Sequence, residues 1–195
     1  MIQECPFNKI CKVHPNCPQN GCGLCFFLKA IKEEEKSYSE NEIDLQLIND
    51  LKNKYLCSWN TYAKSRARGP ATGRAFEKWV IDYLKKNGKN VEKGKVMFKF
   101  GKFNVDPAIP STQNPETILE IKVSQDIQHT LMLEGFIDQL INQKTKIGFV
   151  SFYKPRGKNI LNILSNFQRK HLNQFKYFHI QNGWSNILNQ LIMFC

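Results

Sequence analysis

Two charged side chains interrupt the apolar stretch Ile118-Leu119-Glu120-Ile121-Lys122-Val123. A β-strand points successive side chains to opposite faces, so we expect Glu120 and Lys122 together on one face. Burying a carboxylate and an ammonium group in apolar surroundings is costly. The stretch therefore predicts a strand that presents both charges to a ligand, for which a hydrated metal ion beside a phosphate group is well suited.

A second carboxylate, that of Asp106, ends another strand-like run upstream. The runs 96–100 and 103–106 flank Gly101, which is typical of a β-hairpin with a short turn. Three prolines follow in residues 107–117. Because proline lacks a backbone N–H group, we expect these residues to form a loop that leads to the strand 118–123.

Outward from these strands, hydrophobic periodicity predicts helices over 43–57, 73–87, 126–143, 159–173 and 183–194. Further strands are expected over 147–153 and 176–180, and a connector or polar helix over 29–42. The run 147–153 is almost wholly apolar, which is typical of a strand covered on both faces. These elements predict an α/β fold, with a mixed central sheet flanked by helices.

Length and charge limit the function further. The 195 residues suit one main domain with a small appendage, and the net charge is +11. All of the positive excess lies in residues 61–195, which favours a polyanionic partner such as nucleic acid. A general lysine bias of the sequence is the alternative explanation.

No apolar run approaches the ~20 residues that span a bilayer, and the N-terminus lacks the features of a signal peptide. We therefore expect a soluble, cytoplasmic protein that does not enter a membrane.

Hydrolysis of a phosphodiester needs a divalent cation, usually Mg²⁺, held by oxygen ligands, and a group that orients the attacking water. The carboxylates of Asp106 and Glu120 and the carbonyl of Ile121 are candidate ligands. Lys122 is the candidate for orienting the water, and Glu77 on the preceding helix is a further candidate carboxylate. The alternative is that Glu120 and Lys122 form an ion pair with a purely structural role.

These motifs resemble those of the PD-(D/E)XK nuclease superfamily, whose core is a helix, three strands, a helix and a strand. The resemblance rests on Val105-Asp106-Pro107, on 118–122, and on Gly73-Arg74-Ala75-Phe76-Glu77, which is similar to the superfamily's G-x-x-x-E helix motif. It covers about residues 71–153. It implies metal-binding roles for Asp106 and Glu120, a water-positioning role for Lys122 and a helix-carboxylate role for Glu77. It also implies a restriction-endonuclease-like core over 71–195.

Three positions depart from motifs in that superfamily. Val105 stands where many members have proline, and Phe103 stands where RecB-like members have glycine. Gln143 follows Gln139 at the spacing where RecB-like members have tyrosine. The chain therefore looks most like a type II restriction endonuclease, a DNA endonuclease that cuts double-stranded DNA as a homodimer. A RecB/Cas4-like repair or recombination nuclease and a non-catalytic, zinc-containing nucleic-acid-binding protein are the alternatives.

Two basic segments are candidates for contacts with DNA, because Arg and Lys bind phosphate groups and Arg can also read guanine. The first lies in the expected loop 64–74 and the second follows the strand 147–153. The alternative for both is a solvated loop. Their candidate DNA-binding residues are Lys64, Arg66, Arg68, Arg74, Lys154, Arg156 and Lys158.

Five of the seven cysteines lie in residues 1–25. Residues 1–28 are rich in Cys and Pro, and no long regular element is expected there. Cys22-Gly23-Leu24-Cys25 has the spacing of a metal-binding knuckle. We expect structural Zn²⁺ in this segment, with an iron–sulfur cluster or simple reduced thiols as alternatives. The ligands would come from Cys5, Cys11, His14, Cys17, Cys22 and Cys25. Residues 29–70 would then form a helical and basic-loop region before the core.

Overall fold

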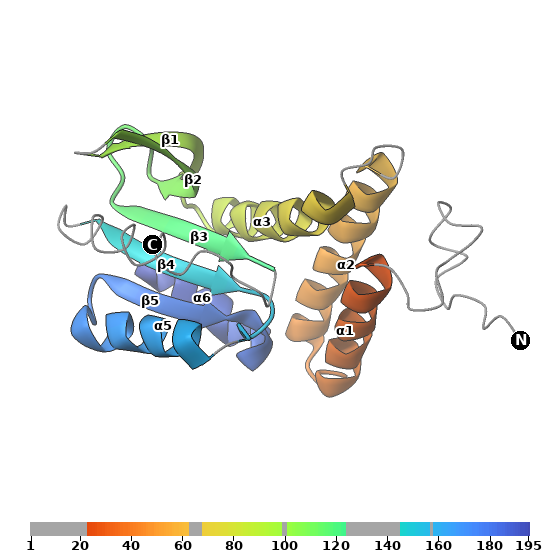
Figure 1. Cartoon of the computed structure of the whole chain (residues 1–195). Coiled ribbons are helices and arrows are strands. Elements are labelled where there is room, and N and C mark those ends of the chain that lie inside the picture. Colours follow the sequence, from red (N-terminus) through yellow and green to blue (C-terminus); the bar gives the residue numbers. More distant parts are fainter. Residues whose placement is uncertain (1–22, 63–67, 99–100, 124–144, 157) are drawn as a thin grey trace, which may run out of the picture. The chain divides into compact units, whose positions relative to one another are not determined.

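The computed structural model describes residues 23–62, 68–98, 101–123, 145–156 and 158–195 (Figure 1). Two compact units make up the chain, Met1–Trp79 and Val80–Cys195. No helix in the described residues is long and apolar enough to cross a membrane. The expected helix 126–143 lies outside the described residues.

In the first unit, α1 (Gly23–Ser37) and α2 (Glu42–Tyr62) pack together. The rings of Phe27 and Tyr55 lie 4.3 Å apart between their centroids, and both side chains are buried. The side chain of Asn41 caps α2, because its Oδ1 accepts a hydrogen bond of 3.1 Å from the backbone N–H of Asp44. The expected helix 43–57 is therefore confirmed and is longer than its periodicity predicts.

The expectation that residues 1–28 contain no long regular element is wrong, because α1 begins at Gly23. Phe27, Leu28 and Ile31 have helical spacing and are all buried. Burial of such a face stabilises a helix. Gly23 and Cys25 of the expected metal-binding knuckle thus lie in the first turn of a helix rather than in a tight turn.

The helix α3 (Arg68–Lys86) begins earlier than the expected residue 73. Part of the expected basic loop 64–74 is therefore helical, and Pro70 is tolerated because it lies in the first turn. The helix ends as the Asn87-Gly88 signal predicts. Gly88 has a φ of 79°, and Lys89 N–H donates a hydrogen bond of 3.0 Å to the carbonyl of Leu84, which is the Schellman arrangement.

A five-stranded sheet in the order β1-β2-β3-β4-β5 forms the centre of the second unit. The β1–β2 and β2–β3 pairs are antiparallel, whereas the β3–β4 and β4–β5 pairs are parallel. The expected mixed sheet is confirmed. Its strands are β1 (Glu92–Phe98), β2 (Gly101–Ile109), β3 (Thr117–Lys122), β4 (Lys146–Ser151) and β5 (Phe175–His179).

The expectation of a loop over all of 107–117 is wrong at both ends. Strand β2 continues through Pro107 to Ile109, and β3 begins at Thr117. Ala108 pairs with both Glu92 of β1 and Ile118 of β3, so this part of β2 is an interior strand.

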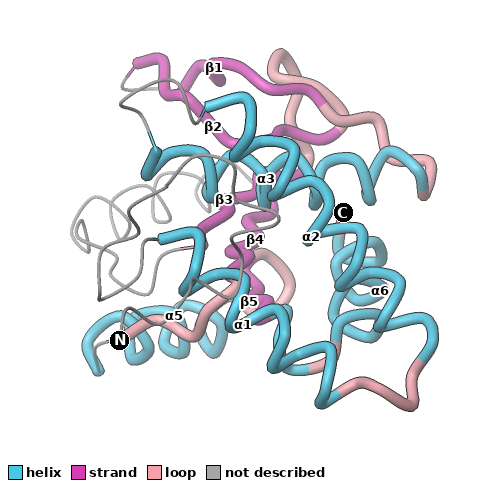
Figure 2. The backbone as a smooth tube through the Cα atoms, turned by 90° about the vertical axis from the view of Figure 1, so that its right-hand side faces the viewer, coloured by secondary structure: helices cyan, strands magenta, loops and turns pink. Residues whose placement is uncertain are grey.

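Helices pack on both faces of this sheet, as expected. On one face, α5 (Lys158–Lys170) contributes Leu164 and Phe167 to a core with Ile118 and Phe149. On the other face, Phe194 of α6 (Trp184–Phe194) contacts Phe178, with 5.5 Å between ring centroids. Figure 2 shows β3, β4 and β5 between α5 and α6.

Candidate functional site

Glu120 and Lys122 form an ion pair on β3, between Glu120 Oε1 and Lys122 Nζ. Both side chains are partly exposed, 21% for Glu120 and 39% for Lys122. The intervening Ile121 is only 6% exposed, and Leu119 is fully buried. The strand therefore presents its two charges on one face and buries its other face. This ion pair fits both the proposed metal site and the structural alternative, so the surrounding positions are needed to choose between them.

Asp106 lies on β2, the strand that pairs with β3. Ala108 is the partner of Ile118, and Ile109 is the partner of Thr117. The described register ends at the Ala108–Ile118 pair, so it does not extend to Asp106 or Glu120, which lie two residues beyond this pair on β2 and β3. The backbone thus brings the two predicted carboxylate positions to neighbouring strands.

A break in the β1–β2 register falls at the same place. Glu92 pairs with Ala108 and Gly94 pairs with Val105, so Lys93 alone faces both Asp106 and Pro107. Two residues opposite one define a β-bulge, a feature that can redirect a side chain beside a functional site. Pro107 suits this place because it cannot donate a ladder hydrogen bond. Asp106 therefore lies in the bulged part of β2, next to the strand that carries Glu120.

Three polar residues on the same face of the sheet were not predicted from the sequence. The β3–β4–β5 registers align Lys122 with Ser151 and His179, and Glu120 with Phe149 and Tyr177. Ser151 Oγ and Tyr177 Oη are 3.0 Å apart and share a hydrogen bond. The ring of His179 stacks on that of Tyr177 with an interplanar angle of 9°. Their grouping depends on strand register, and alternation in Phe-Lys-Tyr-Phe-His was the one available sequence signal.

Burial affects this cluster. Ser151 is fully buried, and burial raises the pKa of Tyr177 above its usual value of 10.0. His179 Nδ1 lies 2.9 Å from Asn182 Oδ1, and this ring nitrogen is the donor because an amide oxygen only accepts. The cluster thus connects β4, β5 and the 3-10 helix η1 (Ile180–Asn182).

Glu77 and Arg74 lie on α3 in the first unit, and Arg74 is exposed. The expected part of Glu77 in the metal site stays a prediction. Arg68 is the first residue of α3, while Lys64 and Arg66 lie outside the described residues.

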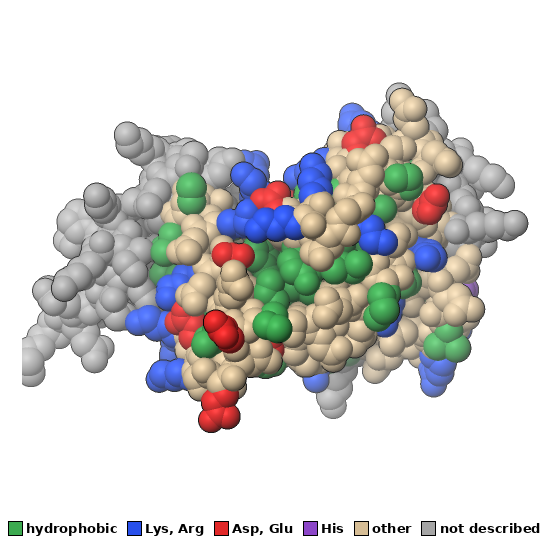
Figure 3. Space-filling model, turned by 180° about the vertical axis from the view of Figure 1, so that it is seen from behind, with side chains coloured by type: hydrophobic (Ala, Val, Ile, Leu, Met, Phe, Trp, Pro, Cys, Tyr) green, Lys and Arg blue, Asp and Glu red, His purple; other side chains and the backbone are tan. Residues whose placement is uncertain are grey.

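In the second unit, Lys154 and Arg156 are exposed after β4, and Lys158 begins α5. Figure 3 shows Lys and Arg side chains in several places on the face that it presents, with Asp and Glu side chains among them.

The expected zinc ligands Cys5, Cys11, His14, Cys17 and Cys22 lie outside the described residues, and Cys25 lies in α1. Among the described residues, no group of three His, Cys, Asp or Glu side chains could hold a metal ion. The proposed magnesium site has only two carboxylates on the sheet and a carbonyl, so it would not form such a group. Both metal sites stay predictions.

No family model matches this chain, nor does any curated protein or solved structure.

Proposed function

We propose that this protein is a Mg²⁺-dependent DNA endonuclease that hydrolyses phosphodiester bonds, of the type II restriction class, with a restriction-endonuclease-like core over 71–195. The observation that carries the proposal is the partly exposed Glu120–Lys122 ion pair on β3, with Asp106 on the neighbouring strand β2. The β-bulge at Asp106–Pro107 adds to it, because β-bulges are over-represented next to active sites. The order α3-β1-β2-β3 also agrees with the start of the superfamily core.

The chemistry of the residues fits a hard divalent cation. Carboxylate oxygens of Asp106 and Glu120 and the backbone carbonyl of Ile121 are the oxygen ligands that Mg²⁺ prefers, and partial exposure of Glu120 leaves access for substrate. When bound there, the ion would neutralise phosphate charge and lower the pKa of a water molecule. Lys122 supplies an ammonium group on the same face, which orients the attacking water and offsets the charge of Glu120.

Double-stranded DNA is the proposed substrate, because the net charge is +11 and the positive excess lies in residues 61–195. Exposed cations such as Arg74, Lys154 and Arg156 would contact its phosphate groups. A homodimer would place two sites on the two strands. Structural Zn²⁺ bound by residues 1–28 would support the N-terminal segment. The proposed setting is the cytoplasm.

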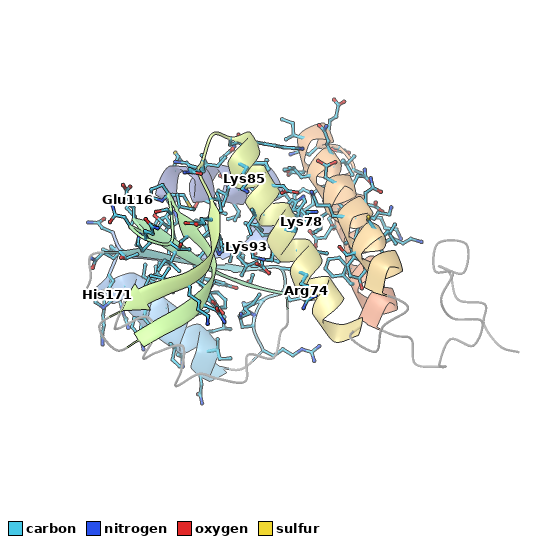
Figure 4. All side chains as sticks on the ribbon, turned by 90° about the horizontal axis from the view of Figure 1, so that it is seen from above. Arg74, Lys78, Lys85, Lys93, Glu116 and His171 are labelled. Carbon is cyan, nitrogen blue, oxygen red and sulfur yellow. The ribbon has the colours of Figure 1, made fainter. Side chains whose placement is uncertain are left out.

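Cleavage of supercoiled plasmid DNA with Mg²⁺ tests the proposal. We expect wild type to produce discrete fragments and Asp106→Ala, Glu120→Ala and Lys122→Ala to produce none. Glu116→Ala is the matched control, since Glu116 is an exposed carboxylate before β3 (Figure 4) that forms hydrogen bonds in the described residues only through its backbone. The proposal fails if wild type cuts no DNA with any divalent metal. If Asp106→Ala cuts like wild type, the site assignment is wrong, and progressive degradation from DNA ends would favour the RecB/Cas4-like alternative.

A further inference from the structure

The exposed side of α3 carries three basic side chains, of which only Arg74 was a DNA-binding candidate from the sequence. Arg74, Lys78 and Lys85 are all exposed, and Figure 4 shows their side chains along this helix. At 3.6 residues per turn, their positions fall within about 40° of one another around the helix axis. The buried residues Phe76 and Val80 lie on the opposite side, and buried Ile81 lies beside the row. We call Arg74, Lys78 and Lys85 the α3 basic row.

We propose that the α3 basic row binds the phosphate backbone of double-stranded DNA. This inference rests on the proposed function and deepens it, because it assigns the duplex to a defined helix face and adds Lys78 and Lys85 to the contacts.

The spacing of the row suits a regular polyanion. A helix rises 1.5 Å per residue, so Arg74 and Lys78 are separated by about 6 Å along the axis and Lys78 and Lys85 by about 10.5 Å. A DNA strand carries one phosphate per about 3.4 Å of duplex axis. A straight helix laid beside the duplex can therefore hold each cation close to a different phosphate. A single small anion would contact at most neighbouring members of the row.

The charges of Lys78 and Lys85 are available to an external ligand. Within the described part of the chain, neither Lys78 nor Lys85 forms an ion pair. Arg74 and Lys78 are like charges four residues apart, and such a pair destabilises a helix. Basic residues on one helix face therefore carry a cost that binding of a polyanion would offset.

The test measures how the affinity for a 20-base-pair duplex depends on salt, with Ca²⁺ in place of Mg²⁺. Lys78→Gln/Lys85→Gln removes two members of the row. The matched control is Lys29→Gln/Lys36→Gln, since Lys29 and Lys36 are exposed lysines with the same seven-residue spacing on α1. Each double variant lowers the net charge equally.

Each phosphate contact contributes about −0.9 to the slope of log K against log salt concentration. We expect the α3 variant to lose about two contacts. Raising the salt from 50 to 200 mM lowers the affinity of both proteins. The fold-decrease should be about ten times smaller for the α3 variant than for wild type. The control should keep the wild-type slope. Equal slopes for wild type and the α3 variant would overturn the inference, as would equal changes in the two variants.

Two further readouts separate this inference from the proposed function. If wild type cleaves DNA and the α3 variant shows a raised KM with unchanged kcat, both stand. If wild type binds the duplex through the row but cleaves nothing, the proposed function fails and the inference survives. Vesicles of phosphatidylcholine and phosphatidylserine at 3:1 form the last arm. Loss of vesicle binding in the α3 variant without loss of duplex binding would overturn the inference in favour of a membrane surface.

Discussion

Replacement of Gly148 by alanine tests the packing that fixes β3 in the sheet. Gly148 and Leu119 are direct partners in the parallel β3–β4 pair. A Cβ atom at position 148 would lie 2.5 Å from Leu119 Cδ2, 3.4 Å from Phe178 and 3.5 Å from Phe194. Real carbon atoms in contact are separated by about 3.5–4.0 Å, so Leu119 would have to move by about 1 Å. Leu119 is fully buried and immediately precedes Glu120.

Overpacking of this kind costs about 1–3 kcal/mol. For a chain of this length, each kcal/mol lowers the midpoint of thermal unfolding by about 2–4 °C, so we expect Gly148→Ala to lower it by about 2–12 °C. Circular dichroism during heating and in urea measures the change. If Gly148→Ala melts at or above the wild-type temperature, the close approach of β3 and β4 described above is wrong.

Gly73→Ala provides a control with the opposite sign. A Cβ atom at Gly73, inside α3, would meet no described atom within 4 Å. Alanine in a helix interior is more stable than glycine by about 0.5–1 kcal/mol. Gly73→Ala should therefore raise stability slightly, which shows that the effect at Gly148 comes from contact and not from loss of glycine.

Three further predictions concern other parts of the second unit and the thiols of Cys57 and Cys195. Trp184→Ala should reduce the free energy of unfolding by about 3–5 kcal/mol in urea titrations, because Trp184 is fully buried against Phe152, and a loss below 1 kcal/mol would contradict its place in the core. Burial raises the pKa of Tyr177, so its contribution to stability is complete below pH 10 and is lost as the pH rises through the folded pKa. Above pH 10, the free energy of unfolding should therefore fall less in Tyr177→Phe than in wild type. Identical pH dependence of the two proteins would refute this. Burial raises the pKa of the Cys195 thiol to about 12, so iodoacetamide at pH 8 should modify exposed Cys57 before Cys195 in a peptide mass map, and equal rates at the two would show that Cys195 is accessible.

The sequence predicted most strands and helices of the second unit, because their apolar patterns match the faces that they bury. The predictions were wrong where strand pairing, helix position or burial outweighed the local preference of a residue. Pro107 was expected in a loop, but a β-bulge tolerates the missing N–H group inside β2. Pro70 is similarly accommodated in the first turn of α3. In α1, burial of Phe27 and Ile31 extends a helix into the cysteine-rich segment.

In the candidate site, too, local sequence patterns predicted one part and the pairing of strands decided the rest. Alternation along one strand was enough to put Glu120 and Lys122 on one face, and their ion pair follows from it. The cluster of Ser151, Tyr177 and His179 was missed, because it forms only through the parallel registers of β3, β4 and β5. Single-strand patterns contain no information about which residue of the next strand becomes a partner.

Binding of Mn²⁺ measured by electron paramagnetic resonance tests the central claim most directly, because it reports on the metal site without requiring cleavage. Mn²⁺ takes the same oxygen ligands as Mg²⁺. We predict one Mn²⁺ ion that Mg²⁺ displaces in wild type and in Glu116→Gln, and its loss in both Asp106→Asn and Glu120→Gln. Wild-type Mn²⁺ binding in either Asp106→Asn or Glu120→Gln would contradict the proposal that these two carboxylates hold the metal.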